Sequence, residues 1–130
     1  MNSSIPQQRR EAARRRGKLA ETLAVIWLRL KLYRILARGV AGGRGSGAGE
    51  IDIVAKRGDI LVFVEVKSRA SLAEAAESLG PNQRRRIQRA AAAFMARRAD
   101  LAHCSIRFDA MLLAPHRLPR HIPDAWRPDS

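Results

Sequence analysis

The stretch "EIDIVAKRGDILVFVEVKSR", residues 50–69, decides the fold because it predicts a β-hairpin. Its two runs, Ile51 to Lys56 and Ile60 to Lys67, follow the period of two that is typical of strands. Between them, "RGD" forms a turn whose glycine can adopt the positive φ that a tight hairpin needs. The stretch therefore predicts two antiparallel strands joined by a short turn.

Three charged residues, Asp52, Glu65 and Lys67, interrupt these otherwise apolar strands. Residues two apart in a strand share a face, so Glu65 and Lys67 project together. If residues 58–59 form the loop, Asp52 lies directly opposite Glu65, with Cβ atoms about 5 Å apart. If residues 57–58 form it, the two acids are diagonal neighbours at roughly 7–8 Å. Either register leaves two carboxylates within reach of one cation.

Two facing carboxylates destabilise a sheet unless a cation lies between them, and a hard divalent ion prefers oxygen ligands. We therefore expect Mg²⁺, or Mn²⁺, to be bound by Asp52 and Glu65. Lys67 beside it could orient a water or stabilise the negative charge of a pentacovalent phosphate, as in phosphodiester hydrolysis. The alternative is structural, with the two acids on a solvent-facing side of the sheet and Lys67 paired with one of them.

The segments around the hairpin complete an α/β pattern. A helix is predicted from Glu11 to Lys31, because Leu19, Leu23, Ile26, Trp27 and Leu30 recur at helical spacing and predict a buried stripe. The other predicted elements are a strand at 33–38, a mobile glycine-rich loop at 39–49, a helical turn or ordered loop at 71–79, a helix at 81–98 and a strand at 105–114, with Ile106, Phe108, Ala110 and Leu112 on one face. The order α-β-β-β-α-β predicts a mixed sheet flanked by helices in a single domain. Residues 1–8 are predicted to be a flexible tail, 9–114 the domain, and 115–130 an irregular, proline-rich tail packed on it.

Glu21 and Gln83 are further candidates for the site, one on each predicted helix. Glu21 shares a helical stripe with Val25 and Leu28, although a local ion pair with Lys18 would explain it equally well. Gln83 lies near the start of its helix, where the free backbone N–H groups favour phosphate binding. A simple side-chain contact at the helix N-terminus would also explain a glutamine at this position. The glycine-rich loop lacks a phosphate-loop ending, so nucleotide binding there is rejected.

The composition indicates a polyanionic partner. The chain has 130 residues, with 25 Lys and Arg against 12 Asp and Glu and a formal net charge of +13, so nucleic acid is the expected partner. A GC-rich genome would explain part of the preference for arginine, but not the net charge. A single cysteine, Cys104, favours a reducing cytoplasm, and no apolar stretch approaches the roughly 18 residues of a membrane helix.

Several stretches together resemble the YraN-like family of small bacterial proteins, which is assigned to the PD-(D/E)xK nuclease superfamily and is similar to archaeal Holliday-junction resolvases. The stretches are "GKLAETLAVIWLRLKLYRILAR", "GEIDIVAKRGDILVFVEVKSR", "PNQRRRIQRAAAAF", "RFDAMLLAP" and "RHIPDAW". The resemblance implies a restriction-endonuclease-like fold and a homodimer. By position it implies an active-site set of Glu21, Asp52, Glu65 and Lys67, with Gln83 as a weaker member and with the three acids as metal ligands.

Two main functions follow from these observations. The first is a metal-dependent endonuclease that hydrolyses phosphodiester bonds of DNA, including branched or junction DNA, with Arg44, Arg69, Arg84 and Arg85 as contacts to phosphates. DNA is favoured over RNA. The second is a nucleic-acid-binding module on the same fold without catalytic activity. A basic RNA- or ribosome-associated protein with no site ranks last, because it leaves the acids in the strands unexplained.

Overall fold

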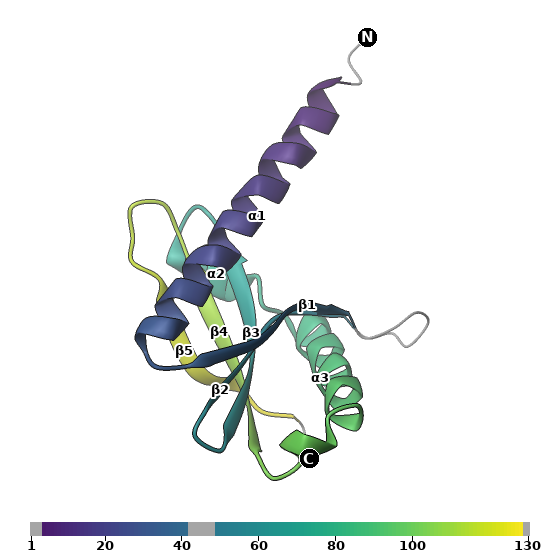
Figure 1. The fold of residues 1–130 in the computed structure, drawn as a ribbon. Coiled ribbons are helices and arrows are strands. Elements are labelled where there is room, and N and C mark those ends of the chain that lie inside the picture. The colour runs from purple at the N-terminus through teal and green to yellow at the C-terminus, as the bar shows by residue number, and fades with distance from the viewer. Residues whose placement is uncertain (1–3, 42–48, 129–130) are drawn as a thin grey trace.

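The computed structural model describes residues 4–41 and 49–128 and contains one five-stranded mixed sheet with helices on both faces (Figure 1). Its elements are α1 (Ser4–Leu30), β1 (Arg34–Ala41), β2 (Glu50–Arg57), β3 (Ile60–Ser68), α2 (Leu72–Glu77), α3 (Pro81–Ala96), the 3-10 turn η1 (Ala99–Leu101), β4 (Ser105–Leu113) and β5 (Arg120–Trp126). The strands lie in the order β1-β2-β3-β4-β5, and only β3 and β4 are parallel. The predicted α-β-β-β-α-β core is confirmed.

The hairpin register follows from the "RGD" turn. Arg57 pairs with Ile60, so residues 58–59 form the two-residue loop, and Gly58 has a φ of 61°. Of the two registers considered, this one places Asp52 and Glu65 opposite each other. A residue with a side chain at 58 would be strained in this turn, because L-residues rarely adopt positive φ.

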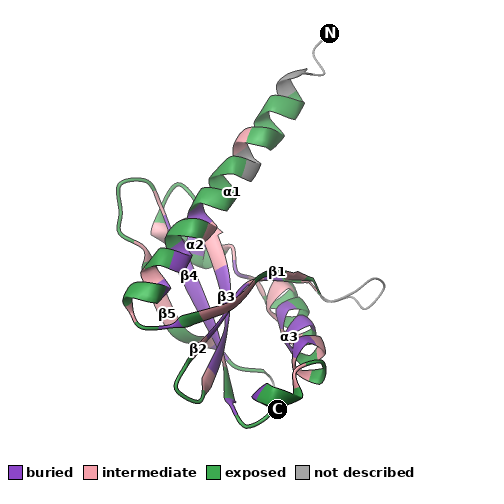
Figure 2. Ribbon diagram, in the orientation of Figure 1, coloured by how far each residue is buried: buried purple, intermediate pink, exposed green. Residues whose placement is uncertain are grey.

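The sheet is buried on both faces, which explains why its central strands are apolar nearly throughout (Figure 2). On one face, Leu61 and Phe63 of β3 pack with Ile87 and Phe94 of α3. On the other face, the core includes Val62 and Val64 of β3 together with Ala20, Ala24, Val25 and Leu28 of α1. Successive side chains of β3 therefore face different helices, and Glu65 belongs to the α3 side.

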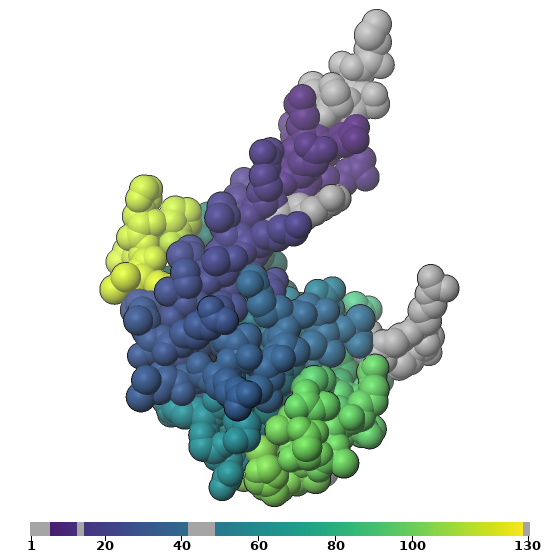
Figure 3. Space-filling model, in the orientation of Figure 1, coloured from purple at the N-terminus to yellow at the C-terminus, as the bar shows by residue number. Residues whose placement is uncertain are grey.

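The first helix corrects two predictions. It begins at Ser4 rather than Glu11, so residues 4–8 of the predicted tail are helical. The predicted buried stripe is wrong, because Leu19, Leu23, Ile26 and Leu30 are exposed and Trp27 is only partly buried. The helix packs instead through Ala20 and Ala24, whose small side chains allow it to approach the sheet closely. Its N-terminal half extends away from the rest of the chain (Figure 3).

The prediction of an irregular C-terminal tail is wrong for residues 120–126, which form the edge strand β5. Trp126 is buried and stacks on Phe108 of β4, with ring centroids 5.3 Å apart, and this contact anchors the strand. Pro123 is compatible with the strand because an edge position leaves its missing N–H without consequence. The register with β4 shifts between Phe108 and Ala110, and Asp124 has a φ of 52° at this irregularity.

Smaller differences concern the other predicted segments. The strand at 33–38 continues to Ala41, so Gly39 belongs to β1, and residues 42–48 of the predicted loop lie outside the described residues. Ile106, placed on the buried face of β4, is 47% exposed. The segment 71–79 contains the short helix α2, capped by the Ser71 hydroxyl, which accepts a hydrogen bond from the Glu74 N–H. No helix in the described ranges is both long and apolar enough to cross a membrane.

Candidate active site

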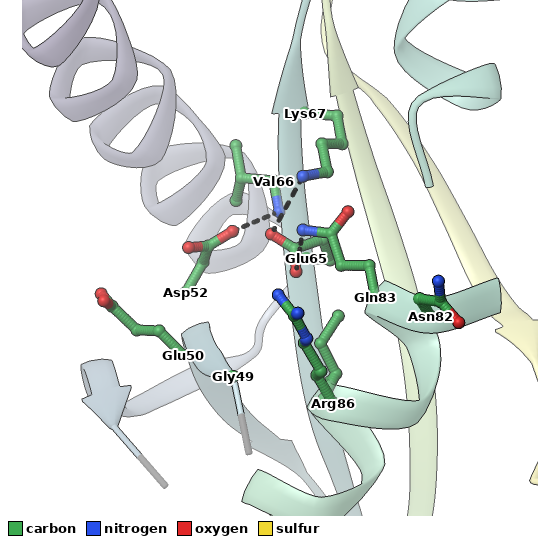
Figure 4. Close-up of a pocket in the computed structure, with 10 residues that line it drawn as sticks. Gly49, Glu50, Asp52, Glu65, Val66, Lys67, Asn82, Gln83 and Arg86 are labelled. Carbon is green, nitrogen blue, oxygen red and sulfur yellow. Dashed lines mark hydrogen bonds and ion pairs between the residues drawn. The ribbon is translucent and has the colours of Figure 1, made fainter. Parts of the chain in front are cut away.

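A pocket of about 590 Å³ opens where β2 and β3 meet the start of α3 (Figure 4). Its lining combines acidic, basic and amide side chains with a few apolar groups: Gly49, Glu50, Asp52, Glu65, Val66, Lys67, Asn82, Gln83, Arg86 and Ile87. Four of the five residues expected in the catalytic set, Asp52, Glu65, Lys67 and Gln83, are therefore brought together by the fold.

Asp52 lies at the point where the β2–β3 ladder ends. The paired residues run from Arg57 and Ile60 to Ile53 and Val64, and one further step places Asp52 opposite Glu65. There the Asp52 carboxylate accepts a hydrogen bond from the Val66 backbone N–H at 2.8 Å. A side-chain oxygen thus satisfies a backbone donor of β3, and this bond fixes the carboxylate beside Glu65.

Glu65 is 4% exposed and has little to stabilise its charge. Burial, a hydrogen bond with Asp52 and the negative charge of Asp52 raise the pKa of Glu65 from 4.5 to about 9, and Glu50 adds to this rise. Lys67 opposes it from 3.9 Å, but does not overcome the other effects. At neutral pH and without a cation, Glu65 therefore holds a proton.

Lys67 and Gln83 complete the surroundings of Glu65. The Lys67 side chain is 12% exposed, so its ammonium is held in the wall of the pocket instead of extending into solvent. Gln83 approaches from α3, and its Nε2 donates to Glu65 Oε2 at 3.5 Å. Gln83 is therefore in contact with the acid pair, which a simple contact at the helix N-terminus would not require. Strand β3 supplies an acid and a base two residues apart, while α3 closes the pocket over them.

Glu21 is the one predicted member that does not line the pocket. It lies on α1, which covers the opposite face of the sheet, and its Oε1 accepts a hydrogen bond from Nε of Arg38 at 3.1 Å. Arg38 also donates to the Thr22 hydroxyl. The ion pair of Glu21 is thus with β1, and not with Lys18 in its own helix.

Of the predicted phosphate contacts, the three that lie within the described residues do not line the pocket. Arg69 is exposed just beyond the end of β3, and Arg85 is exposed on α3 and donates to the Asn82 side chain. Arg84 is partly buried, with its guanidinium over the ring of Trp126 at 6.0 Å. Arg44 lies outside the described residues.

Three polar lining residues, Glu50, Asn82 and Arg86, were not predicted from the sequence. For two of them, the spacing from a predicted residue could have indicated the pocket. Glu50 precedes Asp52 by two residues and so shares its face of the strand, and Arg86 follows Gln83 by three residues and so shares its face of the helix. Asn82 offered no such periodic relation.

The pocket suits Mg²⁺ or Mn²⁺ by its chemistry. Asp52 and Glu65 place two carboxyl groups side by side, and burial together with Asp52 raises the pKa of Glu65 despite Lys67 at 3.9 Å. Within residues 4–41 and 49–128, no group of three or more His, Cys, Asp or Glu side chains is arranged to hold a metal. Magnesium, however, commonly takes one or two carboxylates and fills its other positions with water and substrate phosphate. The acid pair therefore fits such an ion.

A second buried carboxylate lies nearby, on the other face of the sheet. Asp109 of β4 is fully buried, and it accepts two hydrogen bonds from Arg107 at 2.8 Å and one from the Asp124 N–H at 2.9 Å. His121 Nε2 lies 2.6 Å from Asp109, and its Nδ1 lies 2.9 Å from Lys31 Nζ. Because an ammonium can only donate, Nδ1 accepts and Nε2 donates its proton to Asp109. Burial disfavours the Asp109 charge, but its hydrogen bonds with His121 and Arg107 outweigh burial, and the pKa is lowered.

Comparison with known proteins identifies the family of the chain. Residues 20–113 match the uncharacterised protein family UPF0102. The chain belongs to this family. UPF0102 protein amb4503 of Paramagnetospirillum magneticum is 67% identical over 129 residues, which cover 99% of this chain and 100% of the relative. The UPF0102 protein of Parvibaculum lavamentivorans is 51% identical over 117 residues (90% and 85%), and UPF0102 protein Mmar10_3014 of Maricaulis maris is 49% identical over 119 residues (92% and 91%). UPF0102 is the YraN-like family, so the resemblance found in the sequence is confirmed at the level of the family.

Proposed function

We propose that this UPF0102 protein is a metal-dependent endonuclease that hydrolyses phosphodiester bonds of DNA. The observation that carries the proposal is the acid pair Asp52 and Glu65, placed side by side in an open pocket with Lys67 and with the pKa of Glu65 raised to about 9. A fold gains little stability from such an arrangement, because a buried carboxylate beside a second one is costly when its donors are few. Strongly perturbed carboxylates in a pocket are instead typical of catalytic and ligand-binding sites.

Each residue has a role that its position supports. Asp52 and Glu65 would hold Mg²⁺ or Mn²⁺, with Asp52 fixed by the Val66 N–H. A divalent ion bound there would supply Lewis acidity toward a phosphate and lower the pKa of a bound water. The Lys67 ammonium orients the attacking water or stabilises the added negative charge on phosphorus. Gln83 positions Glu65 through their hydrogen bond.

The charge of the chain supports nucleic acid as the substrate. A net charge of +13 favours a polyanion, and Arg69 and Arg85 are exposed just after β3 and on α3, the two elements that supply Lys67 and Gln83. The PD-(D/E)xK resemblance favours DNA over RNA, with branched or junction DNA as the substrate and a homodimer as the acting form.

A cleavage assay tests this proposal directly. Purified protein is incubated with labelled junction, duplex and single-stranded DNA in Mg²⁺, Mn²⁺ or EDTA. Glu65→Ala and Lys67→Ala should each abolish the metal-dependent cleavage while DNA binding stays largely intact. The matched control is Glu77→Ala, an exposed acid on α2 outside the pocket, which should cleave like the wild type. Cleavage that survives both site substitutions in freshly purified protein contradicts the assignment.

One observation favours a second candidate, a nucleic-acid-binding module without catalysis. The third expected metal ligand, Glu21, is paired with Arg38 and does not line the pocket. Both candidates predict binding by counterion release, with log K falling linearly with log salt at a slope of about −0.9 per neutralised duplex phosphate. Binding with this slope and no cleavage of any substrate supports the second candidate, whereas affinity unchanged between roughly 50 and 200 mM salt removes nucleic acid as the partner.

A further inference from the structure

We infer that Arg86 forms a phosphate-binding subsite on the α3 wall of the pocket and contacts the phosphate that is cleaved. The inference rests on the proposed function, since it assigns the reacting group of that substrate to a place in the pocket. The residue lies outside the set that the sequence predicted.

The first step is the position of the side chain. Arg86 lines the pocket from α3, and in Figure 4 its guanidinium points toward the carboxylates of Asp52 and Glu65. Gln83, one turn earlier on the same helix face, contacts Glu65, which shows how closely this face of α3 approaches the acids. Asp52 and Glu65 come from the sheet and Arg86 from the helix, so a group bound between them would contact both walls.

The second step concerns the hydrogen-bond and ion-pair partners of the Arg86 guanidinium. Among the residues that the structure describes, the Arg86 guanidinium has no hydrogen bond and no ion pair. Its neighbour Arg85 donates to Asn82, and Lys67 lies 3.9 Å from Glu65. Arg86 is thus a cation that points into an acidic pocket without being neutralised there. Arginine presents a planar fork of donors that matches two oxygens of a phosphate, so a phosphate is the ligand this side chain suits best.

The third step is the backbone, which holds Arg86 in place. The Gly49 N–H donates to the Arg86 carbonyl at 3.1 Å, joining α3 to the start of β2. A Cβ at position 49 would lie 3.1 Å from the Arg86 Cβ, closer than an ordinary contact. The absence of a side chain at Gly49 therefore lets the helix approach the strand that carries Asp52. This contact holds the Arg86 backbone against the start of β2.

The chemistry follows from these three steps. When a water attacks phosphorus, negative charge develops on the non-bridging oxygens. Lys67 lies on the β3 side, and Arg86 would donate to the same phosphate from the α3 side. Arg86 is then a catalytic residue whose contribution grows as the charge develops, and not one of the arginines that bind the rest of the nucleic acid.

The test compares Arg86→Gln and Arg86→Lys with the matched control Arg97→Gln, which removes an exposed arginine at the far end of α3, outside the pocket. We expect Arg86→Gln to lower kcat on duplex or junction DNA about 100-fold, the size typical of losing one transition-state donor, with a change in KM below about threefold. Arg86→Lys should recover only part of this loss, because it keeps the charge and loses the fork. Arg97→Gln should leave kcat unchanged.

A binding measurement supplies a readout that does not depend on cleavage. Inorganic phosphate, added in the presence of Mg²⁺, should raise the Tm of the wild type and of Arg97→Gln. Arg86→Gln should bind this probe at least about tenfold more weakly and show a correspondingly smaller shift. If Arg86→Gln matches Arg97→Gln in kcat and in phosphate binding, the subsite is disproved. If the wild type cleaves nothing, the nuclease proposal fails, and the phosphate measurement decides the subsite by itself.

A positioning variant strengthens the test. Gly49→Ala keeps the Arg86 side chain but introduces a close contact with its Cβ that would displace it, so we expect a several-fold fall in kcat. The double variant Gly49→Ala with Arg86→Gln should be no slower than Arg86→Gln, because both changes act through one contact. Fully multiplicative effects would show that Gly49 and Arg86 act independently and would contradict the positioning argument. Circular dichroism confirms that each variant is folded.

Discussion

Glu65 and Asp109 are both buried carboxylates on adjacent parallel strands, yet their surroundings differ completely. Val64 pairs with Asp109 and Glu65 with Ala110, so the two acids are close in the sheet and face opposite sides of it. Asp109 receives donors from Arg107, His121 and the Asp124 backbone, and its pKa is lowered. Glu65 faces Asp52, its donors among the described residues are Gln83 and, at 3.9 Å, Lys67, and its pKa is raised to about 9. An acid surrounded by donors stabilises the fold, whereas an acid left short of them indicates a missing ligand.

The largest effect expected from this contrast is on folding stability. Asp109→Asn removes the charge that compensates Arg107 in a buried network, so the free energy of unfolding should fall by about 3–5 kcal/mol. Glu65→Gln removes a strained acid and should leave the metal-free protein as stable as the wild type or more stable. Denaturant unfolding in EDTA measures both. A greater loss for Glu65→Gln than for Asp109→Asn would reverse the roles assigned to the two acids.

The next effect is the response to metal. The wild type should gain about 2.7 kcal/mol of unfolding free energy at a Mg²⁺ or Mn²⁺ concentration a hundredfold above Kd. Asp52→Asn keeps the shape but loses a ligand, so it should gain little, and its stability in EDTA should equal or exceed that of the wild type. Asp109→Asn is the matched control and should keep the full response. Equal responses in calorimetry for the wild type and Asp52→Asn would show that Asp52 is not a ligand.

The two acids should also affect the pH dependence of stability in opposite directions. The folded protein holds the Glu65 proton up to a pKa of about 9, and the unfolded chain releases it near 4.5, so unfolding free energy should fall as pH rises between these values. One group contributes at most about 1.4 kcal/mol per pH unit. Asp109 has a lowered pKa, so its contribution is lost only as pH falls below about 3.8. Glu65→Gln should flatten the profile above pH 4.5 in EDTA, and an unchanged slope would contradict the raised pKa.

The smallest effect concerns Glu21, which the sequence grouped with the site. Its ion pair with Arg38 is partly exposed, so Glu21→Gln should change the free energy of unfolding by only about 0.2–1 kcal/mol. Cleavage should be nearly unaffected, as in the matched variant Arg38→Gln. A fall in kcat of a hundredfold or more in Glu21→Gln alone would place Glu21 in the catalytic set that the resemblance implies.

The parts of the fold that the sequence predicted correctly are those that local chemistry determines. The glycine in "RGD" determines the hairpin register, and that register brings Asp52 to Glu65. The strand period places Glu65 and Lys67 on one face. Gln83 could be placed because the position of Pro81 shows where its helix begins. Four of the ten residues that line the pocket were therefore accessible from short-range patterns.

The parts that it predicted wrongly depend on contacts between distant segments. Leu19 and Leu23 are more apolar than Ala20 and Ala24, but the close approach of α1 to the sheet favours the smaller side chains. Strand β5 forms because it pairs with β4 and because Trp126 packs on Phe108. The prolines around it led to the prediction of an irregular tail. The role of Asp109 was not predicted, because its partners are distant in the chain. His121 follows Asp109 by 12 residues, and Tyr33, which binds Arg107, precedes Arg107 by 74 residues.

These separations have a consequence for the order in which the protein folds. Asp52 and Glu65 belong to one hairpin with a two-residue loop, and an isolated hairpin forms within about 1–10 μs. The network around Asp109 needs the end of α1, β4 and β5, and it includes the pair Lys31 and His121, 90 residues apart. Closing such long loops costs more entropy and takes longer. We therefore expect the two acids to meet first and the stabilising network to close last, so that the chain carries the cost of burying its acid pair through most of folding.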